Sequence, residues 1–227
     1  MTELVIAAAL WIATHLGISS SGLRGWMTAR LGEGAYLGAY SLLAVATLTF
    51  LILAWVDAPR DIWLWYPAPW QTWFALLLMP FAFLLLITGL LGPNPTSVGQ
   101  EGRLADPDTV RGVLRITRHP VQWAFLLWAV AHVPPNGDLA TLIFLAAIAL
   151  VAGAGTLLID RKKALQAGEA WPAFAAATSN LPFAAIAAGR NRFAVRELGI
   201  GKVLLGLLLY AVVIASHRWV AGVPIAI

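Results

Sequence analysis

Residues 139–159, LATLIFLAAIALVAGAGTLLI, contain no charged side chain and decide the fold class. At about 1.5 Å of rise per helical residue, this stretch is long enough to cross a hydrocarbon core about 30 Å thick. The rest of the chain has the same character: 60% of its residues are hydrophobic, 11% are charged, and its mean hydropathy is +0.79. A soluble domain typically carries about 25% charged residues and could not bury so much apolar surface. The sequence therefore excludes a soluble globular protein and predicts an all-α, polytopic membrane protein.

Six stretches of this kind predict a bundle of about six transmembrane helices in a single domain, residues 1–227. The predicted spans are residues 4–22, 35–56, 73–91, 117–134, 139–159 and 201–220. The first has no basic segment before it and no small-residue cleavage site after it, so we expect a retained helix rather than a signal peptide. Residues 160–200 are expected to form a cytoplasmic or interfacial segment. This segment lies along the inner membrane surface or folds back over a cavity in the bundle.

The basic residues are distributed unevenly among the loops. Apart from Arg60 and Arg218, all of the 15 Lys and Arg residues lie in or beside the first, third and fifth loops. Because basic loops stay on the cytoplasmic side of a membrane, we expect the N- and C-termini outside and the bacterial inner (cytoplasmic) membrane as the location. The same distribution explains the net charge of +4. Membrane lipid is therefore an expected partner, and nucleic acid is not.

The chain has no cysteine. This excludes disulfides, thiolate metal sites, iron–sulfur clusters, thiol nucleophiles and covalently attached haem. A cofactor must then be bound without a covalent link, or be held by His, Met, Tyr or carboxylate side chains.

Two of the four histidines are expected near the middle of the membrane. His15 lies eleven residues after Leu4 and His132 lies eleven residues after Val121, so both are about 16 Å deep, from opposite sides. Ionisable groups at this depth are unfavourable to bury and mark functional sites. Two imidazoles at matching depth on antiparallel helices can provide both axial ligands of haem b. The alternative is that both histidines only hydrogen-bond neighbouring helices.

The other two histidines do not fit the same site. His119 is thirteen residues from His132, about 20 Å along a helix, so one iron cannot bind both. His217 is expected well past the midplane, towards the outer face. A mononuclear metal site is disfavoured, because no third His or carboxylate lies at the depth of His15 and His132.

A polar tract lies where the fourth predicted span begins, at the cytoplasmic side. Pro120 suits the first turn of a helix, where its missing N–H is not needed. Arg118 can pair with an anionic group such as a phosphate or a haem propionate, and His119 can donate a hydrogen bond beside it. The alternative is an interfacial anchor at a helix start. Asp160, at the end of the fifth predicted span, is expected to pair with Arg161 or with a neighbouring basic loop residue.

Several tracts resemble the NnrU family of membrane proteins. They are Ile116-Thr-Arg-His-Pro120, Trp128-Ala-Val-Ala-His132 and Ala13-Thr-His15-Leu-Gly17. The resemblance covers nearly the whole chain and implies a role alongside nitrite and nitric oxide reductases in denitrifying bacteria. The 15-cis-zeta-carotene isomerases are similar to NnrU proteins and carry haem b, and their ligands fall on His15 and His132. Those isomerases have a cysteine where this chain has Ala129, which leaves no thiolate for a ligand switch and weighs against carotene isomerase activity.

A second resemblance is to isoprenylcysteine and phospholipid methyltransferases. The tracts that carry it are Arg118-His-Pro120, Asp160 and Gly168-Glu-Ala-Trp171. In that family the corresponding residues help to bind S-adenosylmethionine. Here Gln122 stands where the family has a tyrosine, and Asp160 where it has a pair of acids, so the departures weigh against methyl transfer.

Together these observations predict a haem b protein of NnrU type that acts in redox metabolism linked to denitrification. Its iron ligands would be His15 and His132, and Arg118 and His119 would lie beside the cofactor. The alternatives are a haem-dependent cis–trans isomerase of a carotenoid-like polyene and, less expected, an S-adenosylmethionine-dependent methyltransferase. A membrane scaffold whose histidines only pack helices is a further alternative. A redox partner and a lipophilic small molecule are the expected partners besides lipid.

Overall fold

The computed structural model describes residues 1–18, 21–106, 108–222 and 225. In this part of the chain the regular structure is helical, apart from one isolated bridge between Trp63 and Asp138. The α-helices are α1 (Thr2–Ile12), α2 (Gly22–Leu31), α3 (Glu33–Val56), α4 (Pro69–Leu91), α5 (Pro120–His132), α6 (Leu139–Gln166), α7 (Ala170–Ala177), α8 (Ala184–Ala187) and α9 (Ile200–Val220). Shorter turns are η1 (Ala13–Ile18), η2 (Glu101–Ala105), η3 (Gly112–Arg115) and η4 (Val195–Leu198).

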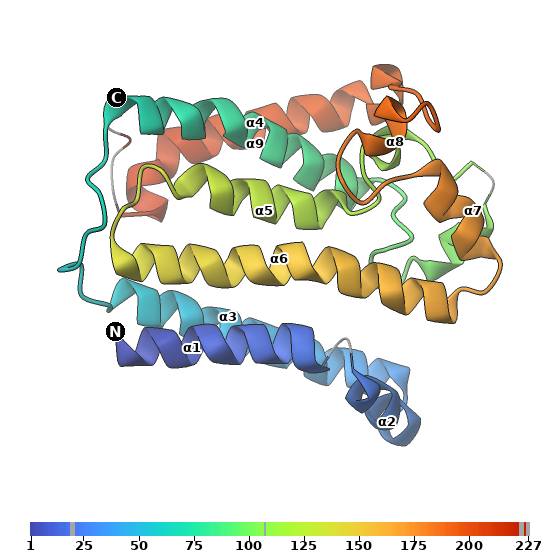
Figure 1. Ribbon diagram of the computed structural model, residues 1–227, viewed down its shortest axis with the longest axis horizontal. Helices are drawn as coiled ribbons and strands as arrows, with labels where there is room; N and C mark the ends of the chain where they lie inside the picture. The colour runs from blue at the N-terminus through green and yellow to red at the C-terminus, as the bar shows by residue number, and fades with distance from the viewer. Residues whose placement is uncertain (19–20, 107, 223–224, 226–227) are drawn as a thin grey trace.

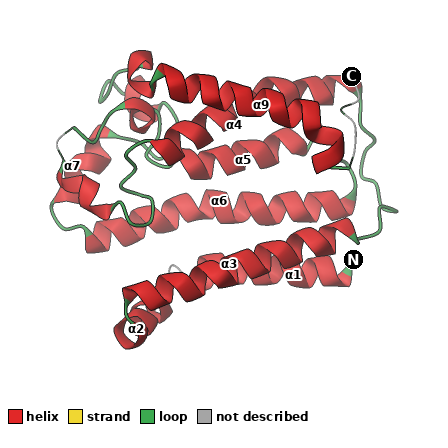
Figure 2. Cartoon of the chain, turned by 180° about the vertical axis from the view of Figure 1, so that it is seen from behind, coloured by secondary structure: helices red, strands yellow, loops and turns green. Residues whose placement is uncertain are grey.

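The long helix α6 lies at the centre of the bundle. α1 and α3 pack against one side of it and α5 against the other, while α4 packs on both α5 and α9. Figures 1 and 2 show α2, α7 and α8 at one end of the bundle, and the N-terminus and the end of α9 at the other. The basic loops therefore gather at one end of the molecule, which we call the basic end.

Among the described residues, four helices are long and apolar enough to span a membrane: α3, α4, α6 and α9. α1 continues through the π-helical η1 and, with α2, makes a pair bent by 73°, which would be a fifth span if it crosses as one unit. α5 has 13 residues, about 20 Å of helix, and does not reach the length of a span on its own. The structure thus supports a multi-pass, all-helical membrane protein, whereas six crossings and the side of the termini stay predictions.

Large apolar side chains cover the outside of the long helices. Leu42 of α3, Leu77 of α4 and Leu157 of α6 are 74%, 68% and 67% exposed. A soluble protein does not present so many exposed leucines on its longest helices. These faces are suited to contact with lipid.

The helix α5 is shorter than the predicted span 117–134. Pro120 occupies its first turn, and His119 before it has φ −123° and ψ 55°, outside the helical region. A residue that precedes proline disfavours the helical conformation, so the helix cannot begin earlier. Pro134 and Pro135 follow its end and prevent it from continuing.

The start of α5 crosses α4 at a glycine. A Cβ atom on Gly89 of α4 would lie 2.8 Å from Cγ and 2.9 Å from Cβ of Pro120, closer than carbon atoms pack. Gly89 therefore allows α4 and α5 to approach closely at this point. The crossing also fixes the position of Arg118 and His119, which directly precede Pro120.

At the opposite end, the loop between α3 and α4 is tied to the turn between α5 and α6. The N–H of Leu64 donates to the carbonyl oxygen of Gly137 at 2.9 Å, and the indole N–H of Trp65 donates to that of Pro134 at 2.7 Å. A side chain on Gly137 would overlap the carbonyl oxygen of Trp65. These contacts hold the end of α5 in place.

Residues 160–200 fold back onto the end of the bundle. α6 continues to Gln166, beyond its predicted end, and α7 follows it. Trp171 and Phe174 of α7 are buried and pack in one cluster with Leu114. The segment thus packs against the bundle through α7, and its position at the membrane surface stays a prediction.

Candidate functional site

The start of α5 and the end of α6 meet in a polar cluster of Arg118, His119 and Asp160. Nε of Arg118 donates to Oδ1 of Asp160 at 2.8 Å, and Nη2 donates to Oδ2 at 2.5 Å. Nε2 of His119 lies 2.6 Å from the same Oδ1. The side-chain amide of Asn180 donates to Oδ2 at 3.3 Å. The Asp160 carboxylate thus accepts hydrogen bonds from three side chains, one of them a bidentate guanidinium.

Backbone contacts from distant segments position this cluster. The Thr96 hydroxyl donates to the carbonyl oxygen of Arg118 at 2.8 Å, and the N–H of Arg118 donates to that of Ser179 at 2.9 Å. The indole N–H of Trp123 on α5 donates to the carbonyl oxygen of Asn180 at 2.8 Å. The cluster therefore depends on the loop after α4 and on the segment after α7, as well as on α5 and α6.

His119 is fully buried, with an exposed fraction of 0%. Its Nε2 faces a carboxylate, which only accepts, so this nitrogen carries the proton and Nδ1 of the neutral ring carries the lone pair. Nδ1 is buried and has no hydrogen-bond partner among the described residues. Burying a polar atom without a partner is unfavourable. Nδ1 is therefore an acceptor suited to a small donor such as a hydroxyl group or a water molecule.

The anion beside Arg118 and His119 is Asp160 of the same chain. Asp160 forms ion pairs with Arg118 and His119, whereas Arg161 is the partner named from the sequence. The basic partner thus comes from the third loop, which lies far from Asp160 along the chain. Contact of Arg118 and His119 with a bound anion or a propionate stays a prediction. The resemblance to the methyltransferases is what groups Asp160 with Arg118 and His119 in the sequence, and the structure brings the three side chains into contact.

His15 lies in η1, the π-helical end of α1, a kind of segment that often occurs at functional sites. Its Nδ1 is 2.9 Å from the carbonyl oxygen of Trp11, four residues earlier. The two rings lie against each other, with centroids 3.6 Å apart. The ring of Tyr40 on α3 lies edge-on at 6.1 Å. Nε1 of Trp11 is buried with no hydrogen-bond partner in the described part of the chain.

His132, the last residue of α5, repeats the arrangement of His15. Its Nδ1 is 2.7 Å from the carbonyl oxygen of Trp128, four residues earlier, and the ring centroids are 4.8 Å apart. A carbonyl oxygen can only accept, so Nδ1 carries the proton in both histidines and the lone pair lies on Nε2. This is the tautomer in which a histidine binds a metal through Nε2 while a carbonyl fixes its orientation.

Both histidines therefore end a Trp-x-x-x-His tract, Trp11–His15 and Trp128–His132, and the two tracts share this spacing. The spacing of four residues places the two rings on the same face of a helix. Neither His119 nor His217 has a tryptophan four residues before it. This shared tract is the sequence signal that distinguishes His15 and His132 from the other two histidines.

The structure places His15 and His132 on helices that do not pack together as neighbours. α1 packs on α3 and α6, and α5 packs on α4 and α6, so α6 lies between them (Figure 1). One iron would need both Nε2 atoms within roughly 4 Å of each other, since metal–nitrogen bonds are about 2 Å long. The donor chemistry of the two rings fits haem b, and their pairing in a single site stays a prediction.

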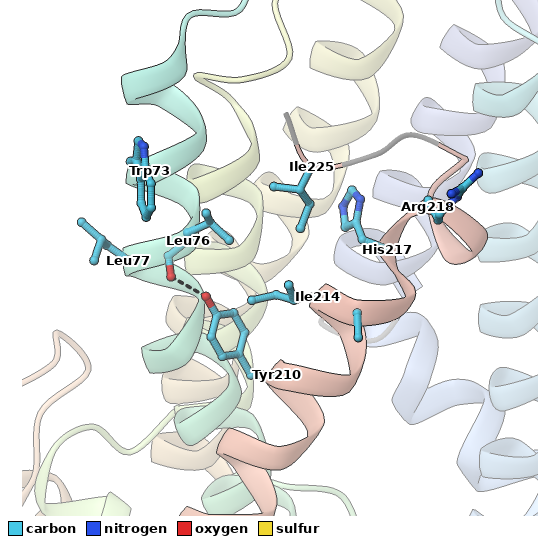
Figure 3. Close-up of a pocket in the computed structure, with 9 residues that line it drawn as sticks. Trp73, Leu76, Leu77, Tyr210, Ile214, His217, Arg218 and Ile225 are labelled. Atoms are coloured by element: carbon cyan, nitrogen blue, oxygen red, sulfur yellow. Dashed lines mark hydrogen bonds between the residues drawn. The ribbon is translucent and has the colours of Figure 1, made fainter. Parts of the chain in front are cut away.

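A cavity of about 610 Å³ opens between α4 and α9. Figure 3 shows the side chains that line it: Trp73, Leu76, Leu77, Tyr210, Ile214, His217, Arg218 and Ile225. The Tyr210 hydroxyl donates to the carbonyl oxygen of Leu76 at 2.6 Å and ties the two helices together. His217 is close enough to His132 to interact with it electrostatically. His217, which was expected away from the site, thus lies within electrostatic range of His132.

A smaller cavity of about 220 Å³ lies between α3, α4, α5 and α6. Its lining is apolar and includes Leu48, Met79, Phe125 and Phe144. Trp128, whose carbonyl oxygen fixes His132, also lines it. This cavity is suited to an apolar chain from the bilayer.

A salt bridge at the basic end joins η3 to η4. Nε of Arg115 donates to Oε2 of Glu197 at 2.7 Å, and Nη2 donates to Oε1 at 3.0 Å. The N–H of Gly112 donates to the same Oε2 at 2.9 Å. The Arg115 guanidinium, and after it the Gly112 N–H, lower the pKa of Glu197. The carboxylate is therefore ionised at neutral pH.

Comparison with known proteins gives one family match. A family model described as NnrU protein matches residues 3–225, nearly the whole chain. No curated protein and no solved structure matches the chain. The matched region contains both Trp-x-x-x-His tracts and the cluster around Asp160.

Proposed function

Because the chain belongs to the NnrU family of membrane proteins, we propose that it is an inner-membrane protein that binds haem b through His15 and His132. Its proposed role is in redox metabolism linked to nitrite and nitric oxide reduction. In this proposal the chain crosses the bacterial inner membrane six times, and both termini lie outside. A membrane-soluble or protein redox partner would exchange electrons with it.

The observation that supports haem binding is the common geometry of the two Trp-x-x-x-His tracts. In each tract the main-chain oxygen of the tryptophan fixes Nδ1 of the histidine, at 2.9 Å for His15 and 2.7 Å for His132. In both rings the bond of Nδ1 lies within the same stretch of helix and fixes the orientation of the imidazole. In this tautomer Nε2 is the nitrogen through which each histidine would bind a metal.

The neighbours of the two rings suit a redox site that is shielded from water. The indoles of Trp11 and Trp128 restrict the rotation of the imidazoles against which they lie. Phe144 lies edge-on to Trp128 at 6.1 Å and adds to this apolar surrounding. Haem b would supply one-electron chemistry here. If His15 and His132 both held the iron, no position would be open to a diatomic gas, so electron transfer or redox sensing would fit better than gas reduction.

The ligands can be tested with absorption spectra of the detergent-purified protein, oxidised and then reduced with dithionite. We expect a six-coordinate b-type spectrum from the unaltered protein and its loss in His15→Ala and His132→Ala. His217→Ala is the matched control, because it removes an imidazole beside His132 that is not part of a Trp-x-x-x-His tract. Size-exclusion profiles of all variants show whether each one is folded.

Two outcomes would overturn parts of this proposal. If His217→Ala loses the spectrum and His15→Ala keeps it, the second ligand is His217 and the proposed pair is wrong. If the unaltered protein is colourless after expression with ample haem, the chain does not bind haem.

The apolar cavity beside Trp128 favours one alternative, a haem-dependent isomerase that acts on a carotenoid-like polyene. A polyene could enter this cavity from the bilayer and lie close to His132. The test is incubation of the reduced and the oxidised protein with a cis-polyene in detergent, followed by chromatography of the isomers. Conversion by the reduced form alone would support the isomerase, and an unchanged polyene would reject it.

The Arg118–His119–Asp160 cluster favours a second alternative, an S-adenosylmethionine-dependent methyltransferase. The structure brings these residues together with Trp171, whose ring lies 5.7 Å from the guanidinium carbon of Arg118. The carboxylate of Asp160, however, is already engaged by Arg118 and His119. Equilibrium dialysis with S-adenosylmethionine tests this function, and absence of binding would reject it.

A further inference from the structure

A third cavity, of about 350 Å³, lies at the basic end between the end of α4 and the start of α9. Its lining includes Thr88 of α4, Gly92 directly after α4, and Val113 of η3. None of its lining residues belongs to the histidine sites or to the Asp160 cluster. The cavity is therefore a separate candidate site.

This cavity has an excess of positive charge. Arg111, before η3, and Lys202, in the first turn of α9, face it from different elements. Glu197 also lines it, but both oxygens of its carboxylate accept hydrogen bonds from Arg115. Arg192 is close enough to act on Glu197 electrostatically. The single carboxylate is thus outnumbered by cations, and an anion is the ligand that the cavity would attract.

The position of Lys202 also favours an anion. The first turn of a helix carries partial positive charge, which disfavours a lysine there and favours a bound anion. Nζ of Lys202 reaches the neighbourhood of Gly92, just beyond the end of α4. The side chain therefore spans the mouth between the two helices, where an anion would touch it.

Exposed apolar side chains follow the cavity on both helices that border it. Leu91, directly before Gly92, is 55% exposed, and Leu205, one turn after Lys202, is 37% exposed. Because residues three apart lie on the same side of a helix, Leu205 shares a face of α9 with Lys202. A molecule with a phosphate in the cavity and apolar chains against these leucines would match both features, and basic pockets between transmembrane helices are known to bind such lipids.

We propose that Arg111 and Lys202 bind the phosphate group of an anionic phospholipid, whose acyl chains lie against Leu91 and Leu205. This site is independent of haem binding. Inorganic phosphate offers the same charge without the chains, so the experiment must separate the two sources.

The test measures thermal unfolding of the detergent-purified protein by tryptophan fluorescence, with added phosphatidylglycerol, phosphatidylcholine or inorganic phosphate. Native mass spectrometry of the same samples counts the phosphatidylglycerol that each protein retains. The variants are Arg111→Gln, Lys202→Gln and the double variant. Arg161→Gln is the matched control, because Arg161 is an exposed arginine after the charge-free part of α6 and does not line the cavity.

We expect phosphatidylglycerol to raise the unfolding temperature and phosphatidylcholine to have little effect. Each single variant should bind phosphatidylglycerol roughly fivefold more weakly, as expected for loss of one cation near anionic lipid. The double variant should lose the shift, and Arg161→Gln should keep it. The proposal is overturned if the double variant retains phosphatidylglycerol like the unaltered protein, or if inorganic phosphate alone gives the full shift. A variant that misfolds is recognised by its unfolding temperature without lipid. In that case the lipid binding of the other single variant tests the proposal.

Discussion

Asp160 pairs with both polar residues that precede α5, Arg118 and His119. Its carboxylate compensates the Arg118 guanidinium and holds the buried His119, and the side chains of Arg118 and Asp160 are only 14% and 18% exposed. If Asp160 is replaced by Asn, the guanidinium loses its counter-charge while it stays largely buried. We expect Asp160→Asn to lower the free energy of unfolding by about 2–3 kcal/mol, as for loss of hydrogen bonds to charged groups. Denaturant unfolding in detergent measures this change.

A matched control for this prediction is Asp57→Asn. Asp57 is exposed after the end of α3, so the same chemical change should alter the free energy of unfolding by less than about 0.5 kcal/mol. If both variants are as stable as the unaltered protein, the cluster does not hold the end of the bundle together.

Glu197 links stability to pH at the basic end. The Arg115 guanidinium lowers its pKa below the ordinary value of 4.5 in the folded protein. Because the pKa of Glu197 is lower in the folded protein than in the unfolded chain, the ionised carboxylate stabilises the fold at pH values above this ordinary pKa. The stabilisation is lost as the pH falls from the ordinary pKa through the lower pKa of the folded protein. We expect the unfolding temperature of the unaltered protein to fall more steeply below about pH 4.5 than that of Glu197→Gln. Parallel curves for the two proteins would contradict the role of this salt bridge.

Residues differ in how far the sequence predicts their roles. Depth along apolar spans singles out His15 and His132, because a helix has a fixed rise per residue. The partners of Arg118 could not be predicted in the same way. They depend on how residues 160–200 fold back, and this segment has no simple apolar period. The neighbourhood of His132 and His217 likewise arises from the packing of α9, which spacing along the chain does not show.

Among the elements, the crossing of α4 and α5 is the most sensitive to a small change. A methyl group on Gly89 would meet Pro120 at 2.8 Å, and the proline ring cannot move away as a flexible side chain can. We therefore expect Gly89→Ala to lower the free energy of unfolding by about 1–3 kcal/mol through overpacking. Gly38→Ala in α3 is the control, because a Cβ there meets no atom within 4 Å. The control should leave stability unchanged or raise it by up to about 1 kcal/mol, since alanine favours a helix over glycine.

The sequence predicts the long helices well and the short ones poorly. The predicted spans 35–56, 73–91 and 201–220 agree with α3, α4 and α9 to within a few residues, since continuous apolar runs define them. α5 is limited by prolines at both ends and comes out shorter than the predicted 117–134. α6 runs past its predicted end because charged residues can continue a helix once it has left the membrane. The predicted first span, 4–22, ends where α2 begins, at Ser21 and Gly22, but the polar residues there do not predict the angle of 73°.

For the whole molecule, the gathering of basic residues at one end leads to a prediction of orientation. If the basic end faces the cytoplasm, both termini lie outside. We expect alkaline phosphatase fused to the C-terminus to be active and a green fluorescent protein fused there to be dark, since each folds on one side only. The opposite pattern would contradict either the orientation or the even number of crossings.

The proposed function requires that this NnrU-family chain hold haem b. The ratio of haem to protein tests this directly, by the pyridine haemochrome method, in the unaltered protein purified after expression with ample haem. We expect one haem b per chain, and none in a preparation of the His15→Ala, His132→Ala double variant that elutes as a folded protein. A ratio near zero in the unaltered protein, or an equal ratio in both proteins, would contradict it.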